Sequence, residues 1–157
     1  FPTRRSSDLV PVFAGVGGGL TTGKRSIDIA LQAELMGAYG VVVNAPTSNE
    51  VISKMSNRID IPVIATVVSE CDDYKGKLDA GAKILNISGG PNTANIVRRI
   101  RNEYGRELPI IATGGPTEES ILETIEAGAN SITYTPPSSA KIFAGVMDQY
   151  RHDQVSK

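Results

Sequence analysis

Apolar runs and amphipathic stretches alternate along this chain from residue 10 onward. Six segments of strand length, most of them mainly apolar, occupy residues 10–16, 40–45, 61–68, 83–87, 109–113 and 131–136. Each is followed by a stretch whose apolar residues recur at helical spacing, as in Ile27, Ala30, Leu31 and in the last stripe, Ile142, Phe143, Val146, Met147 and Tyr150. Runs without regular polar alternation are typical of parallel strands buried on both faces. The pattern therefore predicts six strand–helix units with parallel strands.

The same helix-ending phrase, Gly-Ala, precedes three of the predicted strands at Gly37, Gly81 and Gly128. The repeat is roughly one unit per 22–25 residues, close to the spacing of a compact (βα) barrel. We predict one α/β domain over residues 10–151, a parallel (βα)6, incomplete TIM-barrel-like fold, with an open doubly wound parallel sheet as the alternative. Six units leave two open sheet edges, so we expect a homo-oligomer that pairs through them.

The two ends of the chain fall outside this pattern. Residues 1–9 resemble the translation of a sequencing adapter, with a disordered basic arm as the alternative, and residues 152–157 are expected to be a fraying tail. If residues 1–9 are an artefact, the natural chain begins further upstream. We therefore expect a barrel truncated at its amino-terminal side.

Composition narrows the classes of partner. The 16 Lys and Arg residues nearly balance the 17 Asp and Glu residues, for a net charge of -1, so neither nucleic acid nor an anionic membrane is an expected partner. No apolar run approaches the roughly 20 residues that span a bilayer. A single cysteine, Cys71, cannot form an internal disulfide; together with the lack of a signal peptide, this favours a cytoplasmic protein.

Neutral polar residues and glycines gather where the predicted strands end, which is where ligands bind in parallel α/β folds. Two Gly-Gly-Pro turns, at residues 89–91 and 114–116, each follow a strand and start a helix, so their bare N–H groups can stabilise an anion. The alternative is that these glycines serve only tight turns. We predict a site for phosphate or a small phosphorylated molecule, with candidate binding residues Asn44, Thr66, Asn86, Ser88, Gly89, Gly90, Thr113, Gly114, Gly115, Thr135 and Ser138.

Groups for acid–base chemistry are few. No cluster has the spacing of metal ligands, and no cofactor motif is present, so we expect neither metal nor cofactor. Lys83 could act as a Schiff-base nucleophile if it were buried on its strand. The alternating phase of a strand instead places it on the face opposite Asn86, pointing to solvent. Thr47 and Glu50 have the spacing of a helix capping box.

The segment from Val12 to Pro137 resembles the 2-keto-3-deoxy-6-phosphogluconate aldolase type of phosphate-binding TIM barrel. The resemblance rests on the Gly81-Ala82-Lys83 strand and on the Pro109–Gly115 strand with its Thr-Gly-Gly end. It implies that Lys83 is the Schiff-base lysine and that the two double-glycine turns hold phosphate. The strands that supply the family's general-base glutamate and substrate-binding arginine have no counterpart here. The resemblance thus implies a phospho-sugar-binding relative of class I aldolases, a lyase on a phosphorylated keto acid or sugar if it is active, with activity lost through truncation. The alternative is a non-catalytic oligomeric barrel module.

Overall fold

The computed structural model describes residues 10–17, 21–135 and 138–155. The leader at residues 1–9 and the last residues of the predicted tail lie outside this part of the chain. The described elements alternate strand and helix, in this order: β1 (Phe13–Gly17), α1 (Lys24–Leu35), β2 (Gly40–Val43), α2 (Asn49–Ser56), β3 (Val63–Val67), α3 (Tyr74–Asp79), β4 (Ile84–Ile87), the 3-10 turn η2 (Gly90–Asn92), α4 (Thr93–Tyr104), β5 (Ile110–Thr113), α5 (Glu118–Glu126), β6 (Ser131–Thr133) and α6 (Ser139–Val155).

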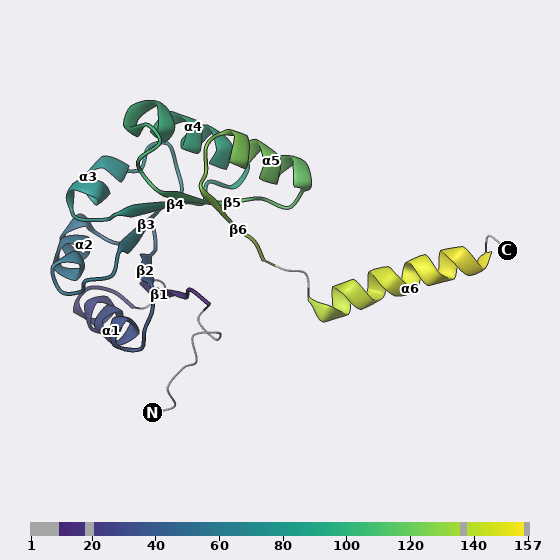
Figure 1. Ribbon diagram of the computed structural model, residues 1–157, viewed down its shortest axis with the longest axis horizontal. Coiled ribbons are helices and arrows are strands. Elements are labelled where there is room, and N and C mark those ends of the chain that lie inside the picture. Colours follow the sequence, from purple (N-terminus) through teal and green to yellow (C-terminus); the bar gives the residue numbers. More distant parts are fainter. Residues whose placement is uncertain (1–9, 18–20, 136–137, 156–157) are drawn as a thin grey trace.

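The strands form one parallel sheet in the order β1-β2-β3-β4-β5-β6, each paired with its neighbour in sequence. Figure 1 shows that this sheet is curled, with α1 to α5 along its convex side. A doubly wound sheet would reverse its strand order and carry helices on both faces, so that alternative is wrong. The predicted incomplete parallel (βα)6, TIM-barrel-like fold is confirmed.

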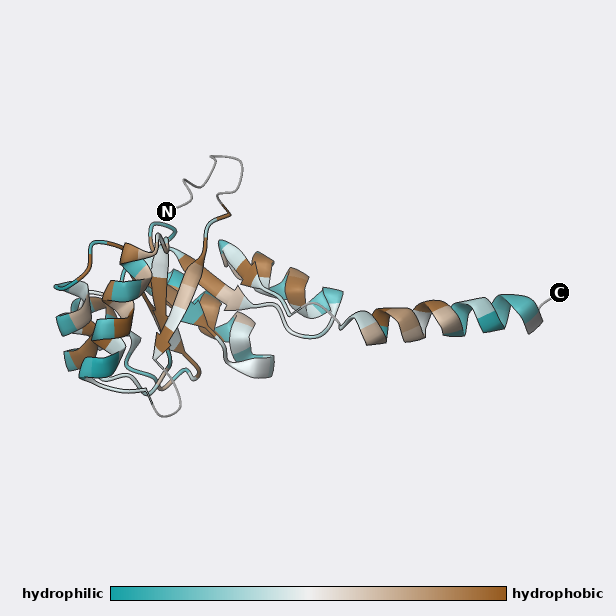
Figure 2. Ribbon diagram, turned by 90° about the horizontal axis from the view of Figure 1, so that it is seen from below, coloured by the Kyte–Doolittle hydropathy of each residue, from teal (hydrophilic) through white to brown (hydrophobic). Residues whose placement is uncertain are grey.

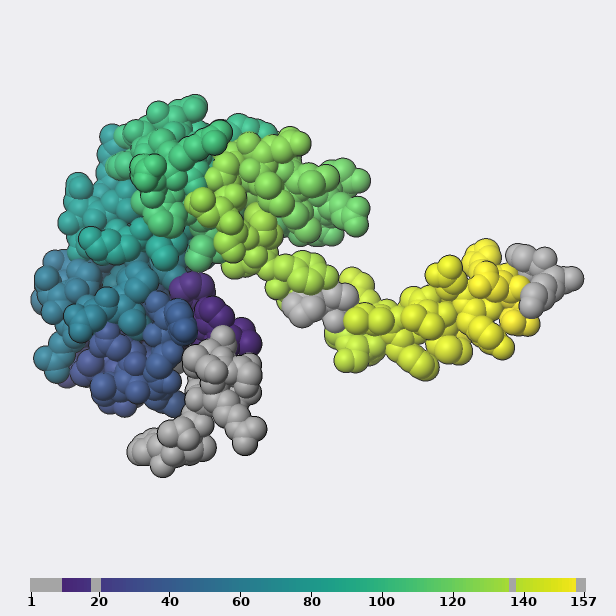
Figure 3. Space-filling view, in the orientation of Figure 1, coloured from purple at the N-terminus to yellow at the C-terminus, as the bar shows by residue number. Residues whose placement is uncertain are grey.

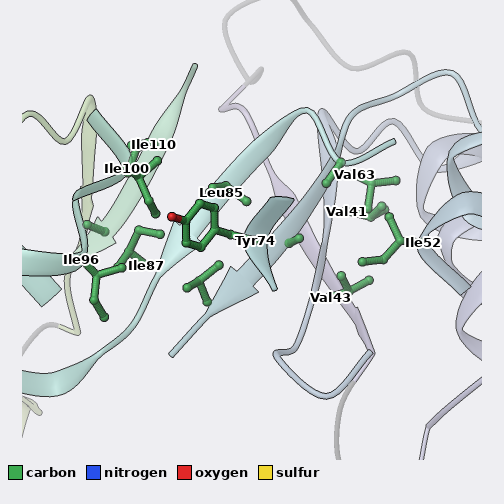
Figure 4. Close-up of a cluster of buried hydrophobic side chains, with 14 of the residues drawn as sticks. Val41, Val43, Ile52, Val63, Tyr74, Leu85, Ile87, Ile96, Ile100 and Ile110 are labelled. Carbon is green, nitrogen blue, oxygen red and sulfur yellow. The ribbon is translucent and has the colours of Figure 1, made fainter. Parts of the chain in front are cut away.

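The main core lies between the convex face of the sheet and the helices (Figure 4). Strand residues such as Val43, Leu85 and Ile87 are fully buried there, against helix residues such as Ile52 and Ile100. Figure 2 shows that the strands are largely hydrophobic, whereas the helices also carry hydrophilic residues. All five residues of β3 are buried, on both faces, which fits the lack of polar alternation in its run. In β4 and β5 buried residues alternate with partly exposed ones.

Helix starts depart from the sequence prediction at α2. The predicted capping box of Thr47 and Glu50 is wrong: Ser48 is the N-cap, and its Oγ accepts a hydrogen bond from the Val51 N–H at 3.4 Å. The Thr47 hydroxyl instead donates to the Asn44 side-chain oxygen at 2.8 Å. Glu50 pairs with Lys54 one turn later. Thr47 and Ser48 are both hydroxyl residues, so the sequence alone does not show which of them is the N-cap.

The last helix, α6, stands away from the curled sheet (Figures 1 and 3). Four residues of its predicted apolar stripe are exposed: Ile142, Phe143, Val146 and Tyr150. The helix also continues to Val155, beyond the predicted start of the tail. Within the described ranges, no helix has both the length and the apolar character needed to cross a membrane.

Candidate functional site

The two Gly-Gly-Pro turns lie side by side, because β4 and β5 are neighbours in a parallel sheet. Gly89 leads from β4 into η2 and α4, and Gly114 leads from β5 into α5. Their second glycines, Gly90 and Gly115, have φ angles of +59° and +77°, a left-handed conformation that side chains strain to adopt. Both strand-to-helix turns therefore present compact backbone at the same edge of the sheet.

A cavity of about 500 Å³ lies between these turns. Hydroxyl groups and glycine backbone make up much of its wall, with one carboxylate and no lysine or arginine among its lining residues. The lining consists of Ser88, Gly90, Pro91, Thr93, Ala94, Thr113, Gly114, Gly115, Pro116, Thr117, Ser120, Glu123 and Thr124. The structure thus brings together five of the residues predicted from sequence: Ser88, Gly90, Thr113, Gly114 and Gly115.

Thr93, at the start of α4, links the two turns, and sequence reasoning missed it. Its buried Oγ1 accepts a hydrogen bond from the Gly89 N–H at 3.0 Å and donates to the Gly90 carbonyl at 2.8 Å. The same atom lies 3.5 Å from Oγ1 of Thr113 at the end of β5. The only sequence signal was its place four residues after Gly89, where it closes the turn. Thr93 therefore holds the first turn in shape and sets it against β5.

The turn after β5 is held by its own capping box. Oγ1 of Thr117 accepts from the Ser120 N–H, and Oγ of Ser120 accepts from the Thr117 N–H, both at 3.2 Å. Ser120 Oγ also lies 2.8 Å from the Gly114 carbonyl. A side chain on Gly114 would meet Ile121 and Ile132 at 2.7 Å. Close packing thus gives Gly114 a structural reason to be glycine, as the tight-turn interpretation expects.

Charged groups lie at the margin of the cavity. The carboxylate of Glu123 is 3.3 Å from the guanidinium of Arg98, and both side chains are about half exposed. Glu118 and Glu119 occupy the first turn of α5, where carboxylates complement the helix dipole. Any anion in the cavity would thus be bound mainly by backbone N–H and hydroxyl groups, rather than by a cationic side chain.

A second cavity, of about 810 Å³, adjoins the first across the β5–α5 turn, and the two share Thr113, Gly115, Pro116 and Thr117. It extends to the end of β6, where Thr135 contributes to its lining, and to Lys141 on α6. Ser138 has another role, since its Oγ accepts a hydrogen bond from the Lys141 N–H at 3.3 Å at the start of α6.

Three of the predicted polar residues lie outside these two cavities. Asn86 of β4 is in register with Thr66 of β3, and its Nδ2 donates to Thr66 Oγ1 at 3.2 Å. The Asn86 Oδ1 atom is buried and has no hydrogen-bond partner in the described part of the chain. Asn44 is occupied with Thr47 in the β2–α2 turn. These residues line neither cavity of the β4–β6 edge.

Lys83 lies apart from all of these groups. It is exposed and precedes β4, with its N–H donating to the Val63 carbonyl at the first residue of β3. The glycine turns follow the last residues of β4 and β5. Because the strands are parallel, Lys83 lies at the amino ends of the strands, whereas the cavity lies at their carboxyl ends. The lysine is exposed, as the alternative interpretation of its sequence position expects.

A buried lysine does occur elsewhere, and the sequence gave no sign of it. Lys77 of α3 is 5% exposed, and its Nζ donates to the Ala45 carbonyl after β2 at 2.7 Å. Burial lowers the pKa of this ammonium group, while the nearby carboxylates of Asp72 and Asp73 act in the opposite direction. Lys77 thereby ties α3 to the β2–α2 turn. Among the described residues, no group of three His, Cys, Asp or Glu could hold a metal ion.

Comparison with known proteins gives structural matches only. No protein-family model matches the chain, and no curated protein matches its sequence. A mandelate oxidase mutant with a monooxide FMN adduct matches with a TM-score of 0.64 and 17% identity, covering 78% of this chain and 47% of that chain. A phosphoenolpyruvate phosphomutase from Streptomyces platensis subsp. rosaceus matches with a TM-score of 0.61 and 18% identity, covering 96% of this chain and 63% of that chain.

The chain spans about half the length of the mandelate oxidases it matches. Identities of 16–18% establish likeness of fold and nothing finer. The aldolase family named by the sequence resemblance is absent from the matches described above. The structural neighbours are TIM-barrel-type enzymes, and this chain has the fold of a partial TIM barrel.

Proposed function

We propose that the cavity between the β4 and β5 turns binds the phosphate group of a small phosphorylated molecule. One observation carries the proposal: two Gly-Gly-Pro turns, each at the start of a helix, line the same cavity. In the described part of the chain, no hydrogen bond within the protein occupies the N–H of Gly90 or of Gly115. Free N–H groups at helix starts are favourable ligands for phosphate oxygens.

The names of the structural neighbours are consistent with this chemistry. One acts on phosphoenolpyruvate, and the other carries FMN, which is itself a phosphate monoester. The proposal does not extend to Schiff-base chemistry at Lys83, because that lysine is exposed at the opposite edge of the sheet. The proposal concerns recognition of the phosphate group. The rest of the ligand would lie in the adjoining cavity, beside Thr135 and Lys141.

The test is a titration of ¹⁵N-labelled protein, with phosphoenolpyruvate in one series and pyruvate in the other. We expect saturable amide shifts at Gly90 and Gly115 with phosphoenolpyruvate, and none with pyruvate, because only the former carries phosphate. Inorganic phosphate should shift the same amides at higher concentration. Equal shifts with both organic acids, or shifts that avoid both turns, would contradict the proposal.

A further inference from the structure

The cavity between the β4 and β5 turns contains a charge that opposes the proposed ligand. Among the described residues that line it, Glu123 of α5 carries the only carboxylate, and none is a lysine or arginine. Glu123 lies three residues after Ser120, a member of the capping box at the start of α5. A phosphate held by the N–H groups of Gly90 and Gly115 would therefore share the cavity with a negative side chain.

The repulsion between the carboxylate and the phosphate would reach across the cavity. A compact space of about 500 Å³ is about 10 Å across, which is close to the distance at which about 0.1 M salt screens a charge. A carboxylate at that range, or nearer, weakens the binding of a doubly charged phosphate severalfold. Binding is therefore stronger if a cation compensates the charge of Glu123.

Arg98 of α4 supplies such a cation from outside the cavity. Helices α4 and α5 lie side by side (Figure 1), and Nη2 of Arg98 donates to Oε1 of Glu123 at 3.3 Å. This is the only ion pair of Glu123 in the described part of the chain. Arg98 is not among the described lining residues, so its guanidinium contacts the carboxylate without filling the space for a ligand.

A row of side chains holds Arg98 in this position. Its Nη1 donates to Oδ1 of Asn95 at 2.9 Å, and Nδ2 of Asn95 donates to Oδ1 of Asn92 at 2.9 Å. Nδ2 of Asn92 in turn donates to Oε1 of Glu70, in the β3–α3 loop, at 2.7 Å. Ion pairs between half-exposed side chains contribute little to stability, so a folding role alone does not account for the placement of Arg98.

We propose that Arg98 is a positioning residue of the phosphate site, which neutralises Glu123 so that the two glycine turns can bind a doubly charged phosphate. The direct contacts with phosphate remain those of backbone N–H and hydroxyl groups, and Arg98 acts only through the carboxylate. This inference rests on the proposed function. It adds to that function a residue outside the cavity that sets the affinity for phosphate.

The first test is a calorimetric titration with phosphoenolpyruvate at low salt. Arg98→Met should weaken binding at least about threefold, because the charge of Glu123 is no longer compensated. Arg98→Lys keeps a cation and should bind nearly as well as the wild type. Arg99→Met is the matched control: it removes the same charge from the next residue, whose ion pair is with Glu70, and should leave the affinity unchanged. Urea midpoints should agree among these proteins, since Arg98 and Arg99 are both about half exposed.

The second test asks whether Arg98 acts through Glu123. Adding Glu123→Gln to Arg98→Met removes the uncompensated carboxylate, and should return the affinity to about the wild-type value. In about 1 M salt the loss caused by Arg98→Met alone should largely disappear, because the screening distance falls to about 3 Å. A double variant that binds as weakly as Arg98→Met would show that Arg98 contacts the ligand itself, which contradicts the proposal.

The two proposals for this cavity fail in different ways. If wild-type protein shows no phosphate-dependent amide shifts at Gly90 and Gly115, both the phosphate site and the role of Arg98 are wrong. If the wild type binds phosphoenolpyruvate at these turns and Arg98→Met binds it equally well, the phosphate site stands and only the role of Arg98 is overturned. Equal weakening by Arg98→Met and Arg99→Met would also overturn that role, because it would reflect net charge rather than the pair with Glu123.

Discussion

Replacing Thr93 by valine tests the link between the two turns of the cavity. Valine has nearly the shape of threonine but cannot accept the hydrogen bond from the Gly89 N–H or donate one to Gly90. Gly90 is exposed, so water can replace the bond to its carbonyl, but Gly89 is only partly exposed. An unpaired, partly buried donor costs about 1–3 kcal/mol. We therefore expect Thr93→Val to lower the free energy of unfolding by about that amount.

The assay is urea unfolding followed by circular dichroism, since the chain has no tryptophan. With a slope of about 1–3 kcal/mol per molar urea, the midpoint should fall by roughly 1 M. The amide of Gly89 should also exchange with solvent at least about tenfold faster. Thr93→Ser is the matched control: it loses one buried methyl group, at a cost of about 1 kcal/mol, but keeps the hydroxyl and so the slow exchange at Gly89. Unchanged Gly89 exchange in the valine variant would refute the reasoning.

Three further predictions concern the buried lysine Lys77, the core residue Leu85 and the exposed lysine Lys83. Lys77→Met should flatten the pH dependence of stability. Burial lowers the Lys77 pKa in the folded state, so the wild-type free energy of unfolding rises with pH between that lowered pKa and the ordinary value of 10.5. Urea midpoints measured from pH 7 to 10.5 should show this rise in the wild type and not in the variant, and equal slopes would contradict the prediction. Leu85→Ala should cost about 2–5 kcal/mol in the same unfolding assay, because Leu85 is fully buried beneath the helices, and a loss under 1 kcal/mol would be inconsistent with this core. Borohydride treatment with pyruvate should leave no adduct on Lys83 by mass spectrometry, and a stoichiometric adduct there would restore the Schiff-base interpretation.

The repeating architecture could be read from the sequence because apolar residues of successive strands are buried against the helices. In the run Ile61–Val68 only Thr66 carries a polar group, and such a mainly apolar run of strand length can be recognised from the local sequence alone. Strand ends were less visible: this run was predicted to begin at Ile61, but β3 starts at Val63 and stops at Val67. The end of a strand depends on where its neighbour stops pairing, which is information from another part of the chain.

The site was predictable in part for the same reason. The turns containing Gly90 and Gly115 were found because left-handed glycine is a local necessity. Thr93 and Lys77 were missed, since their roles are hydrogen bonds to turns contributed by other segments. The position of α6 could not have been derived either: its stripe predicts burial, but nothing in the spacing says which surface buries it.

The most direct test of the phosphate site compares two substitutions at Gly90. This glycine lines the cavity, and a Cβ added there meets no atom within 4 Å. Asparagine and aspartate tolerate its left-handed backbone about equally, so Gly90→Asn and Gly90→Asp differ essentially in one negative charge. Calorimetric titration with phosphoenolpyruvate should give near wild-type affinity for the asparagine variant and at least about tenfold weaker binding for the aspartate variant, because a carboxylate a few ångströms from a phosphate repels it. Equal affinities for the two variants would contradict phosphate binding between the β4 and β5 turns.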